Sequence, residues 1–244
     1  MRYLVLSDVH ANLEALSAVL DASAGEWEQV LVLGDLVGYG ADPNAVIDRV
    51  RALPVAAMVR GNHDKVAAGL ASVDSFNHVA RLAIEWTTAA LTPENLRWLA
   101  ALPQGPVAID AMTEICHGAP WDEDAYLFDE RDVERARPSL ARPLSLFGHT
   151  HVPSIFRIEP SVEAMLPVRG ERCRVPIEDG RYLVNCGAVG QPRDSDPRAA
   201  FGLLDSDNRA LTIVRTPYDV AAAQTKILNA GLPAVLAQRL ALGR

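Results

Sequence analysis

Two histidines separated by a single residue, His149 and His151, stand where an apolar run of the chain ends. Side chains two positions apart on extended backbone point to the same side, so both imidazoles can converge on one object. The chain has six histidines, and five of them follow apolar runs. The other three of these are His10, His63 and His117, and only His78 lies elsewhere, on a helical stripe. This distribution indicates one gathered site.

Carboxylate and amide residues accompany the histidines at the same points. The candidate ligands are Asp8, His10, Asp35, Asn62, His117, His149 and His151. Seven donors exceed the four that one tetrahedral zinc takes, and they suit two metal ions about 3.5–4 Å apart with a shared carboxylate. Imidazole, carboxylate and amide donors without a thiolate favour manganese, iron or zinc over copper.

The elements that position these residues begin with strands and helices in alternation. Short apolar runs predict buried strands over 3–8, 29–35 and 54–62, and helical spacing predicts helices over 12–22 and 42–53. Crossovers of about 20 residues are typical of parallel βαβ units. Ligands of such sheets sit beyond the carboxyl ends of the strands, which is where the candidate ligands lie.

The remaining sequence predicts a mixture of elements. Residues 64–102 read as helices, and short strands are expected within 105–118, 142–152 and 181–187. A hairpin is predicted over 203–214, and two short helices over 218–242. The charge-dense segment 119–143 is expected to be a surface excursion. No internal repeat or linker is evident, so residues 1–244 are expected to form a single domain.

Composition limits the partners of this α/β protein. Hydrophobic residues make up 49% of the 244, and the net charge is −8. An acidic chain without a basic run is a poor ligand for duplex nucleic acid or an anionic membrane. No apolar run reaches membrane-spanning length, the N-terminus lacks the pattern of a signal peptide, and the three cysteines form no CxxC. A cytoplasmic location is therefore expected. Whether the C-terminal helices pack on the core or on a second copy, giving a homo-oligomer, stays open.

Five short blocks together resemble the calcineurin-like metallophosphoesterases, in particular their small bacterial and archaeal phosphodiesterase-type members. The blocks are DVH (8–10), GDLVG (34–38), GNHD (61–64), CHG (116–118) and GHTH (148–151). The segment VNCGAVGQPRD (184–194) is similar to a further block of those small phosphoesterases, although Cys186 and Ala188 replace the usual proline and serine.

The resemblance implies a four-layer α/β/β/α sandwich and a dinuclear metal site. It assigns one metal ion to Asp8, His10, Asp35 and His151, and the other to Asp35, Asn62, His117 and His149. A hydroxide bridging the two ions would attack phosphorus in line. His63 would protonate the leaving group, and Asp64 is a candidate to orient that imidazole or raise its pKa.

Substrate contacts are less defined. Asn12 is a candidate donor to phosphate, and it is equally suited to cap the first helix. Arg60 and Arg193 are candidate phosphate contacts, with structural roles as the alternative. Protein phosphatases and symmetrical dinucleoside tetraphosphatases extend the second block to GDxVDRG, whereas this chain has GDLVGYG, with Tyr39 in place of the arginine.

These features favour a small-molecule phosphodiesterase or nucleotide pyrophosphohydrolase that uses two divalent ions, with manganese preferred. A phosphomonoesterase is the alternative. A nuclease is disfavoured by the net charge of −8. A non-catalytic metal-binding scaffold is the remaining possibility, and it is disfavoured because no ligand and no general acid is missing.

Overall fold

The apolar runs near the N-terminus fold into three parallel strands joined by helices, as their pattern predicts. The elements are β1 (Arg2–Leu6), α1 (Leu13–Ala22), β2 (Gln29–Val32), α2 (Pro43–Arg51) and β3 (Val55–Met58). Strand β2 pairs in parallel with both β1 and β3. The computed structural model describes residues 1–165, 168, 170–175, 177 and 180–244.

The other elements follow in chain order. They are α3 (Asn62–Ala67), η1 (Val73–Ser75), α4 (His78–Ala90), α5 (Pro93–Ala100), β4 (Val107–Ala108), β5 (Thr113–Ile115), α6 (Glu130–Ala136), η2 (Arg137–Ser139), β6 (Leu144–Phe147), β7 (Ser154–Arg157), β8 (Glu163–Ala164), β9 (Arg172–Val175), β10 (Tyr182–Asn185), β11 (Ala199–Asp205), β12 (Ala210–Thr216), α7 (Val220–Asn229) and α8 (Ala234–Leu240).

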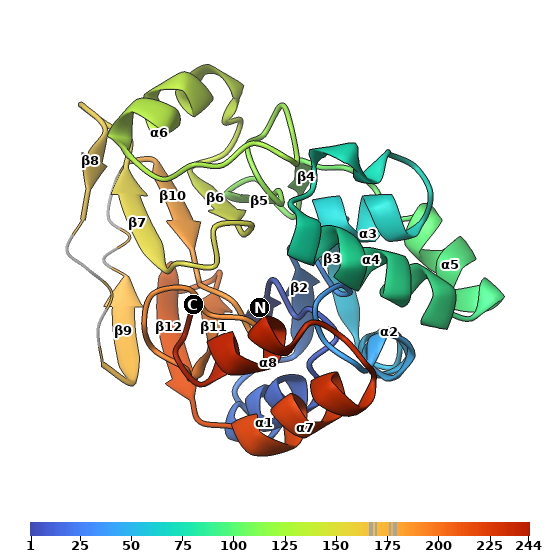
Figure 1. Cartoon of the computed structure of the whole chain (residues 1–244). Helices are drawn as coiled ribbons and strands as arrows, with labels where there is room; N and C mark the ends of the chain where they lie inside the picture. Colours follow the sequence, from blue (N-terminus) through green and yellow to red (C-terminus); the bar gives the residue numbers. More distant parts are fainter. Residues whose placement is uncertain (166–167, 169, 176, 178–179) are drawn as a thin grey trace.

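Two mixed sheets of six strands form the centre of the molecule (Figure 1). The first has the order β3-β2-β1-β11-β12-β9, and the second has the order β4-β5-β6-β10-β7-β8. The predicted hairpin is present as β11 and β12, which pair antiparallel. In the second sheet β6 is parallel to both β5 and β10. Each sheet therefore presents a set of parallel carboxyl ends.

Alternation along β1 shows how the layers form. Tyr3 and Val5 face the second sheet, and they pack in a core with Leu31 of β2 and Leu146 of β6. Leu4 and Leu6 face the other way, into a core formed with α1, α2 and neighbouring helices. On the outer side of the second sheet, Val133 of α6 packs with strand side chains. Figure 1 shows α6 and α1 on opposite sides of the two sheets. This is the predicted α/β/β/α architecture.

One predicted boundary is wrong. The third strand was expected to include Asn62, but β3 ends at Met58 and Asn62 begins α3. The Asp64 carboxylate accepts a hydrogen bond from the main-chain N–H of Gly61, which closes a capping box at the helix start. This local cap ends the extended chain, so GNHD lies at a helix N-terminus.

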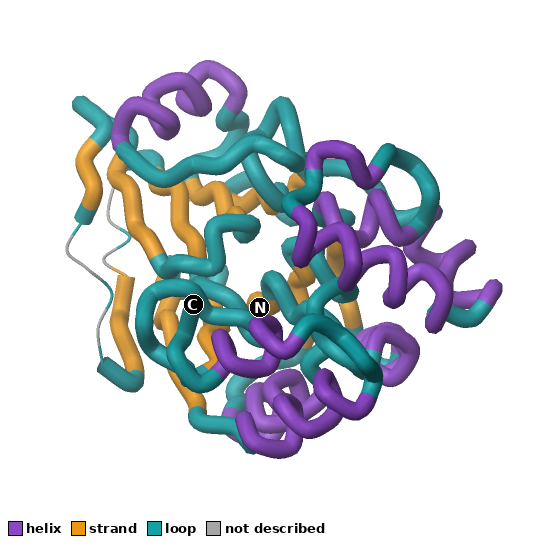
Figure 2. Tube along the Cα trace, viewed as in Figure 1, coloured by secondary structure: helices purple, strands orange, loops and turns teal. Residues whose placement is uncertain are grey.

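The C-terminal helices pack on the body of the protein. Figure 2 shows α8 as a purple coil near the loops at the centre of the view and α7 below it, beside α1. Ile227 of α7 and Leu236 of α8 form a separate apolar core with Ala83 of α4 and the ring of Tyr39. The C-terminal segment thereby covers part of the loop that follows β2.

Segment 119–143 is only partly the surface excursion that was expected. Phe128 is 60% exposed, but Leu127 and Val133 are buried. Glu123 is buried as well and pairs with Arg60 and Lys65. The segment therefore closes one side of the structure as well as carrying surface charge.

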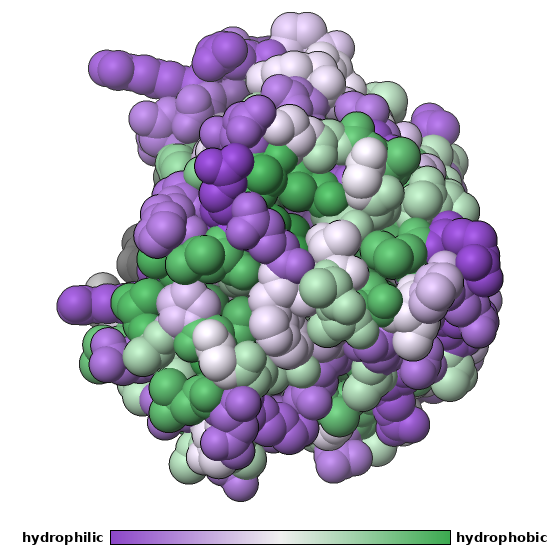
Figure 3. Space-filling view, turned by 45° about the vertical axis from the view of Figure 1, so that its right-hand side comes forward, coloured by the Kyte–Doolittle hydropathy of each residue, from purple (hydrophilic) through white to green (hydrophobic). Residues whose placement is uncertain are grey.

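No helix in the described part of the chain is long and apolar enough to cross a membrane. The face shown in Figure 3 carries separate apolar patches among hydrophilic side chains.

The inter-sheet core predicts the effect of one truncation. Leu31→Ala should lower the free energy of unfolding by about 2–5 kcal/mol, because a fully buried side chain between the sheets leaves a cavity. Urea denaturation measures this change. Leu82→Ala, at a position 41% exposed on α4, is the control and should change it by no more than about 0.5 kcal/mol. Equal effects of the two variants would contradict the assigned core.

Candidate metal centre

The predicted ligands gather where the carboxyl ends of both sheets meet. Two groups of side chains place their ligand atoms within 4.8 Å of one another: Asp8, His10, Asp35 and His151 in the first group, and Asp35, His117 and His149 in the second. All are almost completely buried. The groups share Asp35, which is the arrangement that the resemblance implies for a bridging carboxylate.

One carboxylate oxygen of Asp35 lies between the two groups. Its Oδ2 atom is 3.5 Å from Nε2 of His10 and 3.4 Å from Nε2 of His117. Its Oδ1 atom accepts a hydrogen bond of 2.9 Å from the main-chain N–H of His63. One carboxylate oxygen is thus held by the protein while the other faces both histidines.

The first group is tightly arranged. Nε2 of His151 lies 3.1 Å from Nε2 of His10 and 3.4 Å from Oδ1 of Asp8. The Asp8 carboxylate also accepts hydrogen bonds from the hydroxyl of Ser7 at 2.7 Å and from the main-chain N–H of His149. Asp8 and His10 come from the first sheet and His151 from the second, so the group spans both sheets.

Each of the four ligand histidines has one ring nitrogen within hydrogen-bond distance of a main-chain carbonyl oxygen. The Nδ1 atoms of His10, His117 and His151 lie 2.9, 2.7 and 2.6 Å from the carbonyl oxygens of Val37, Leu33 and Gln191. When Nδ1 carries the proton, Nε2 is left free to bind metal. His149 is reversed, because its Nε2 lies 3.1 Å from the carbonyl oxygen of Asp124. Its Nδ1 is the free atom.

Asn62 supplies an independent sign that a cation fits here. Its buried Oδ1 atom has no hydrogen-bond partner among the described residues. A buried polar oxygen without a partner is costly, and a metal ion would satisfy it. The donor set contains carboxylate, imidazole and amide groups, as divalent manganese, iron or zinc require. The residues present therefore fit a metal pair.

The backbone is bent sharply at the ligands. Five ligand residues adopt left-handed conformations: Asp8 (φ 53°), His10 (47°), Asp35 (53°), His149 (65°) and His151 (60°). This region is sparsely populated by residues other than glycine, and it is costly unless the surroundings enforce it. At Gly61 the constraint is space, since a Cβ atom there would stand 2.0 Å from Oδ1 of Asp35.

Burial and mutual charge decide the protonation of the metal-free site. Burial raises the pKa of Asp8 to about 6. Burial also opposes ionisation of Asp35, but the neighbouring imidazoles of His117 and His63 outweigh it and hold that pKa well below its usual range. Burial would lower the pKa of His117, yet Asp35 outweighs this and raises it to about 10. To serve as a metal ligand in the second group, His117 would therefore have to lose its proton.

Two further ligand histidines, His149 and His151, are neutral at physiological pH. Burial, with the nearby charge of His117, lowers the pKa of His149 to about 3. Burial, with the charge of Arg193, holds the pKa of His151 well below its usual range. Neutral imidazole is the form that binds metal.

His63 lies beside the ligands with its Nδ1 atom buried and unpartnered among the described residues. Burial lowers its pKa to about 4. Asp64 does not orient this ring, because its carboxylate accepts from the main-chain N–H groups of Leu36, Val37 and Gly61. Asp64 therefore braces the GDLVG loop against α3, and the suggestion that it raises the His63 pKa is not supported by these contacts.

The two predicted substrate contacts differ. Asn12 caps α1, because its Oδ1 accepts from the N–H of Ala15 and its Nδ2 donates to the carbonyl of Gly190. Of its two predicted roles, the structure therefore shows the cap. Arg193 lies next to the first group, since its own N–H donates to the carbonyl of His151. Arg60 is paired with the buried Glu123 and is structural.

A cavity of about 150 Å³ opens beside the second group and His63. Its wall includes Phe76, Asn77 and Tyr126. The sequence offered Tyr126 as a ring that could stack on a nucleobase, with ordinary packing as the alternative, whereas nothing in the motifs indicated Phe76 or Asn77. Phe76 lies 4.6 Å from the ring of His63, and Tyr126 stacks on His149 at 3.9 Å between ring centroids. Aromatic residues are too common in cores for their type alone to have revealed this position.

The shared oxygen of Asp35 yields a test. Asp35→Ala should lose both metal ions, because it removes a ligand from each group. Metal analysis of the protein after reconstitution and desalting measures the loss. Asp21→Ala, an exposed position on α1, is the matched control and should keep two ions. A variant lacking Asp35 that still holds two ions would exclude the bridge.

Comparison with known proteins agrees with this geometry. Residues 1–209 match the family model of the calcineurin-like phosphoesterase superfamily domain. A metallophosphoesterase crystal structure from Sphaerobacter thermophilus is 40% identical, with a TM-score of 0.88 over 100% of this chain and 99% of that one. An uncharacterized protein of Methanocaldococcus jannaschii, MJ0912, is 37% identical over 98% of this chain and 97% of its own length. The hypothetical protein PH1004 of Pyrococcus horikoshii shares the fold at 19% identity, with a TM-score of 0.79 over 100% and 98% of the two chains. The chain therefore belongs to the calcineurin-like phosphoesterase superfamily.

Proposed function

We propose that this protein hydrolyses a phosphodiester or nucleotide pyrophosphate bond of a small molecule, using two divalent cations, with manganese preferred. The observation that carries this proposal is the single Oδ2 atom of Asp35 between two groups of ligands, with His63 beside it. Two cations about 3.5–4 Å apart would supply an activated water and neutralise charge on the phosphoryl oxygens.

The residues of the chain have distinct tasks in this reaction. The side chains of the two groups would hold the cations, with Asp35 as the ligand shared by both. The imidazole of His63 delivers a proton to the leaving oxygen, which otherwise departs as an unstable alkoxide. In its metal-free surroundings His63 is neutral, because burial lowers its pKa to about 4. A negatively charged phosphoester beside it would raise that pKa and favour the acid form. Asp64 is a positioning residue through the loop it braces.

Tyr39 supports a small-molecule diester over a protein phosphatase substrate. Its ring packs 4.7 Å from His10 and 4.4 Å from His63, in the position where the GDxVDRG motif has an arginine. The site thus lacks that phosphate-gripping side chain. The net charge of −8 continues to weigh against a nuclease, and the complete ligand set and His63 weigh against a non-catalytic scaffold.

The substrate class is tested by manganese-dependent hydrolysis of bis(p-nitrophenyl) phosphate beside p-nitrophenyl phosphate. We expect a higher kcat/KM on the diester, and activity only after metal-stripped protein is reloaded. A preference for the monoester would instead identify a phosphatase. If the protein binds two metal ions but hydrolyses neither substrate, the result would contradict the proposed hydrolysis of simple phosphoesters.

The role of His63 is tested by His63→Ala. It should lower kcat on alkoxide-leaving diesters by about 10²–10⁴-fold while two metal ions remain bound, because general acid catalysis contributes factors of this size. His78→Ala changes an exposed histidine at the start of α4 and serves as the control. Retained turnover in the His63 variant would exclude the assignment.

A further inference from the structure

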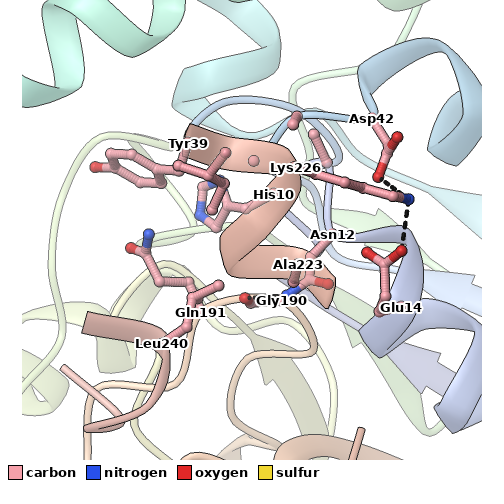
Figure 4. A pocket seen from close by; sticks show the side chains of 14 residues that line it. His10, Asn12, Glu14, Tyr39, Asp42, Gly190, Gln191, Ala223, Lys226 and Leu240 are labelled. Atoms are coloured by element: carbon pink, nitrogen blue, oxygen red, sulfur yellow. Dashed lines mark hydrogen bonds and ion pairs between the residues drawn. The ribbon is translucent and has the colours of Figure 1, made fainter. Parts of the chain in front are cut away.

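Most cations near the site already have acidic partners. Lys226 of α7 pairs with Asp42 and Glu14, as the dashed lines in Figure 4 show. Arg60 and Lys65 pair with Glu123, and Arg215 pairs with Asp194. These side chains are structural, and their charges are neutralised.

Two arginines differ from this pattern. In the described part of the chain, no aspartate or glutamate side chain lies within ion-pair distance of Arg193 or Arg239. Arg193 donates through Nη2 to the amide oxygen of Gln191 at 2.9 Å, and its buried Nε has no partner among the described residues. Arg239 of α8 has no acidic side chain beside it among the described residues, and its Nε donates to the terminal main-chain carboxyl group at Arg244.

Both guanidinium groups lie against one ring. The Cζ atom of Arg193 is 5.7 Å from the centroid of Tyr39, and that of Arg239 is 5.8 Å from it. The same ring packs 4.7 Å from His10, a ligand of the first group. Figure 4 shows His10 and Tyr39 side by side, with Gln191 and Leu240 of α8 close by. Two segments far apart in the sequence thus bring two cations to the edge of the metal centre.

This arrangement is costly unless an anion is present. Two positive groups near one another and partly removed from water repel, and the attraction of each to the Tyr39 ring offsets only part of the cost. Burial and the charge of Arg193 lower the pKa of Arg239 accordingly. Two bound divalent cations would add to the repulsion. A phosphate group with two or more negative oxygens relieves it, because guanidinium groups bind phosphate through paired hydrogen bonds.

We propose that Arg193 and Arg239, which both lie against the Tyr39 ring, bind a second phosphate group of the substrate beside the scissile one. The substrate is then a nucleotide pyrophosphate or polyphosphate rather than a diester with a single charge. This inference rests on the proposed function and narrows it. The single charge of a simple diester is met by the metal pair alone, whereas a phosphoanhydride places a second anionic group next to the scissile phosphorus.

Cleavage of such a substrate requires only water as the second reactant. The water oxygen forms a bond to one phosphorus as the bond from that phosphorus to the bridging oxygen breaks. The bridging oxygen leaves on the second phosphate with a proton, and the two arginines hold that second phosphate. No oxidant or further reactant is needed.

The test compares two substrates that differ by one phosphate group, bis(p-nitrophenyl) phosphate and P1,P2-bis(p-nitrophenyl) pyrophosphate, with the manganese-loaded protein. Arg239→Gln should lose about tenfold or more of kcat/KM on the pyrophosphate relative to its loss on the diester, mainly through KM. Arg239→Lys should recover part of the loss because it keeps a charge. Arg49→Gln, at an exposed arginine of α2 with no acidic partner among the residues that the structure describes, is the matched control.

A binding measurement gives a second readout that does not need turnover. Calorimetry of the manganese-loaded protein should show that Arg239→Gln weakens binding of methylenediphosphonate about tenfold more than binding of methylphosphonate. An equal effect on both phosphonates, or none on either, would overturn the second-phosphate site. If wild-type protein cleaves neither ester but this difference in binding is found, the proposed function fails and the anion site stands. Cleavage of the diester with no selective effect of Arg239→Gln rejects the site alone.

Discussion

A single buried carboxylate oxygen, Oδ2 of Asp35, sets the geometry of this protein. It faces His10 on one side and His117 on the other, and those histidines come from different sheets. A centre built in this way depends on how the two sheets pack, because a small slide between them would separate the ligand groups. The apolar core between the sheets, in which Tyr3, Val5 and Leu31 meet residues of the second sheet, therefore supports the site as much as any ligand does.

Forming the site also costs folding free energy. It buries carboxylates and imidazoles and holds five ligand residues in left-handed backbone conformations. Main-chain hydrogen bonds offset part of this cost, since every ligand histidine engages a carbonyl and the Asp8 and Asp35 carboxylates accept main-chain N–H groups. Among the described residues the buried Oδ1 atom of Asn62 has no hydrogen-bond partner, and a bound cation would satisfy it.

The surroundings of the candidate metal centre differ in the second block from the GDxVDRG pattern, which carries an arginine there. Tyr39 fills that position and contacts His10 and His63. Two arginines from other segments lie against the same ring: Arg193 of the loop after β10 and Arg239 of α8. The sequence left open whether the C-terminal helices pack on the core or on a second copy. Packed on the core, α8 places the charge of Arg239 against the Tyr39 ring.

The sequence alone determined the order of strands and helices near the N-terminus, the α/β architecture and the seven candidate ligands. These were readable because buried strands and ligand motifs are local, and each motif directly follows an apolar run. The start of α3 at Asn62 was misread because a cap formed by Asp64 outweighs the extended pattern before it. Only the tertiary structure decided the partners of Asp64, the capping role of Asn12, and the neighbourhood of Phe76, Tyr126 and Arg239. Those contacts join residues distant in the chain, and no local spacing encodes them. They arise when two sheets and two terminal helices pack around one buried carboxylate.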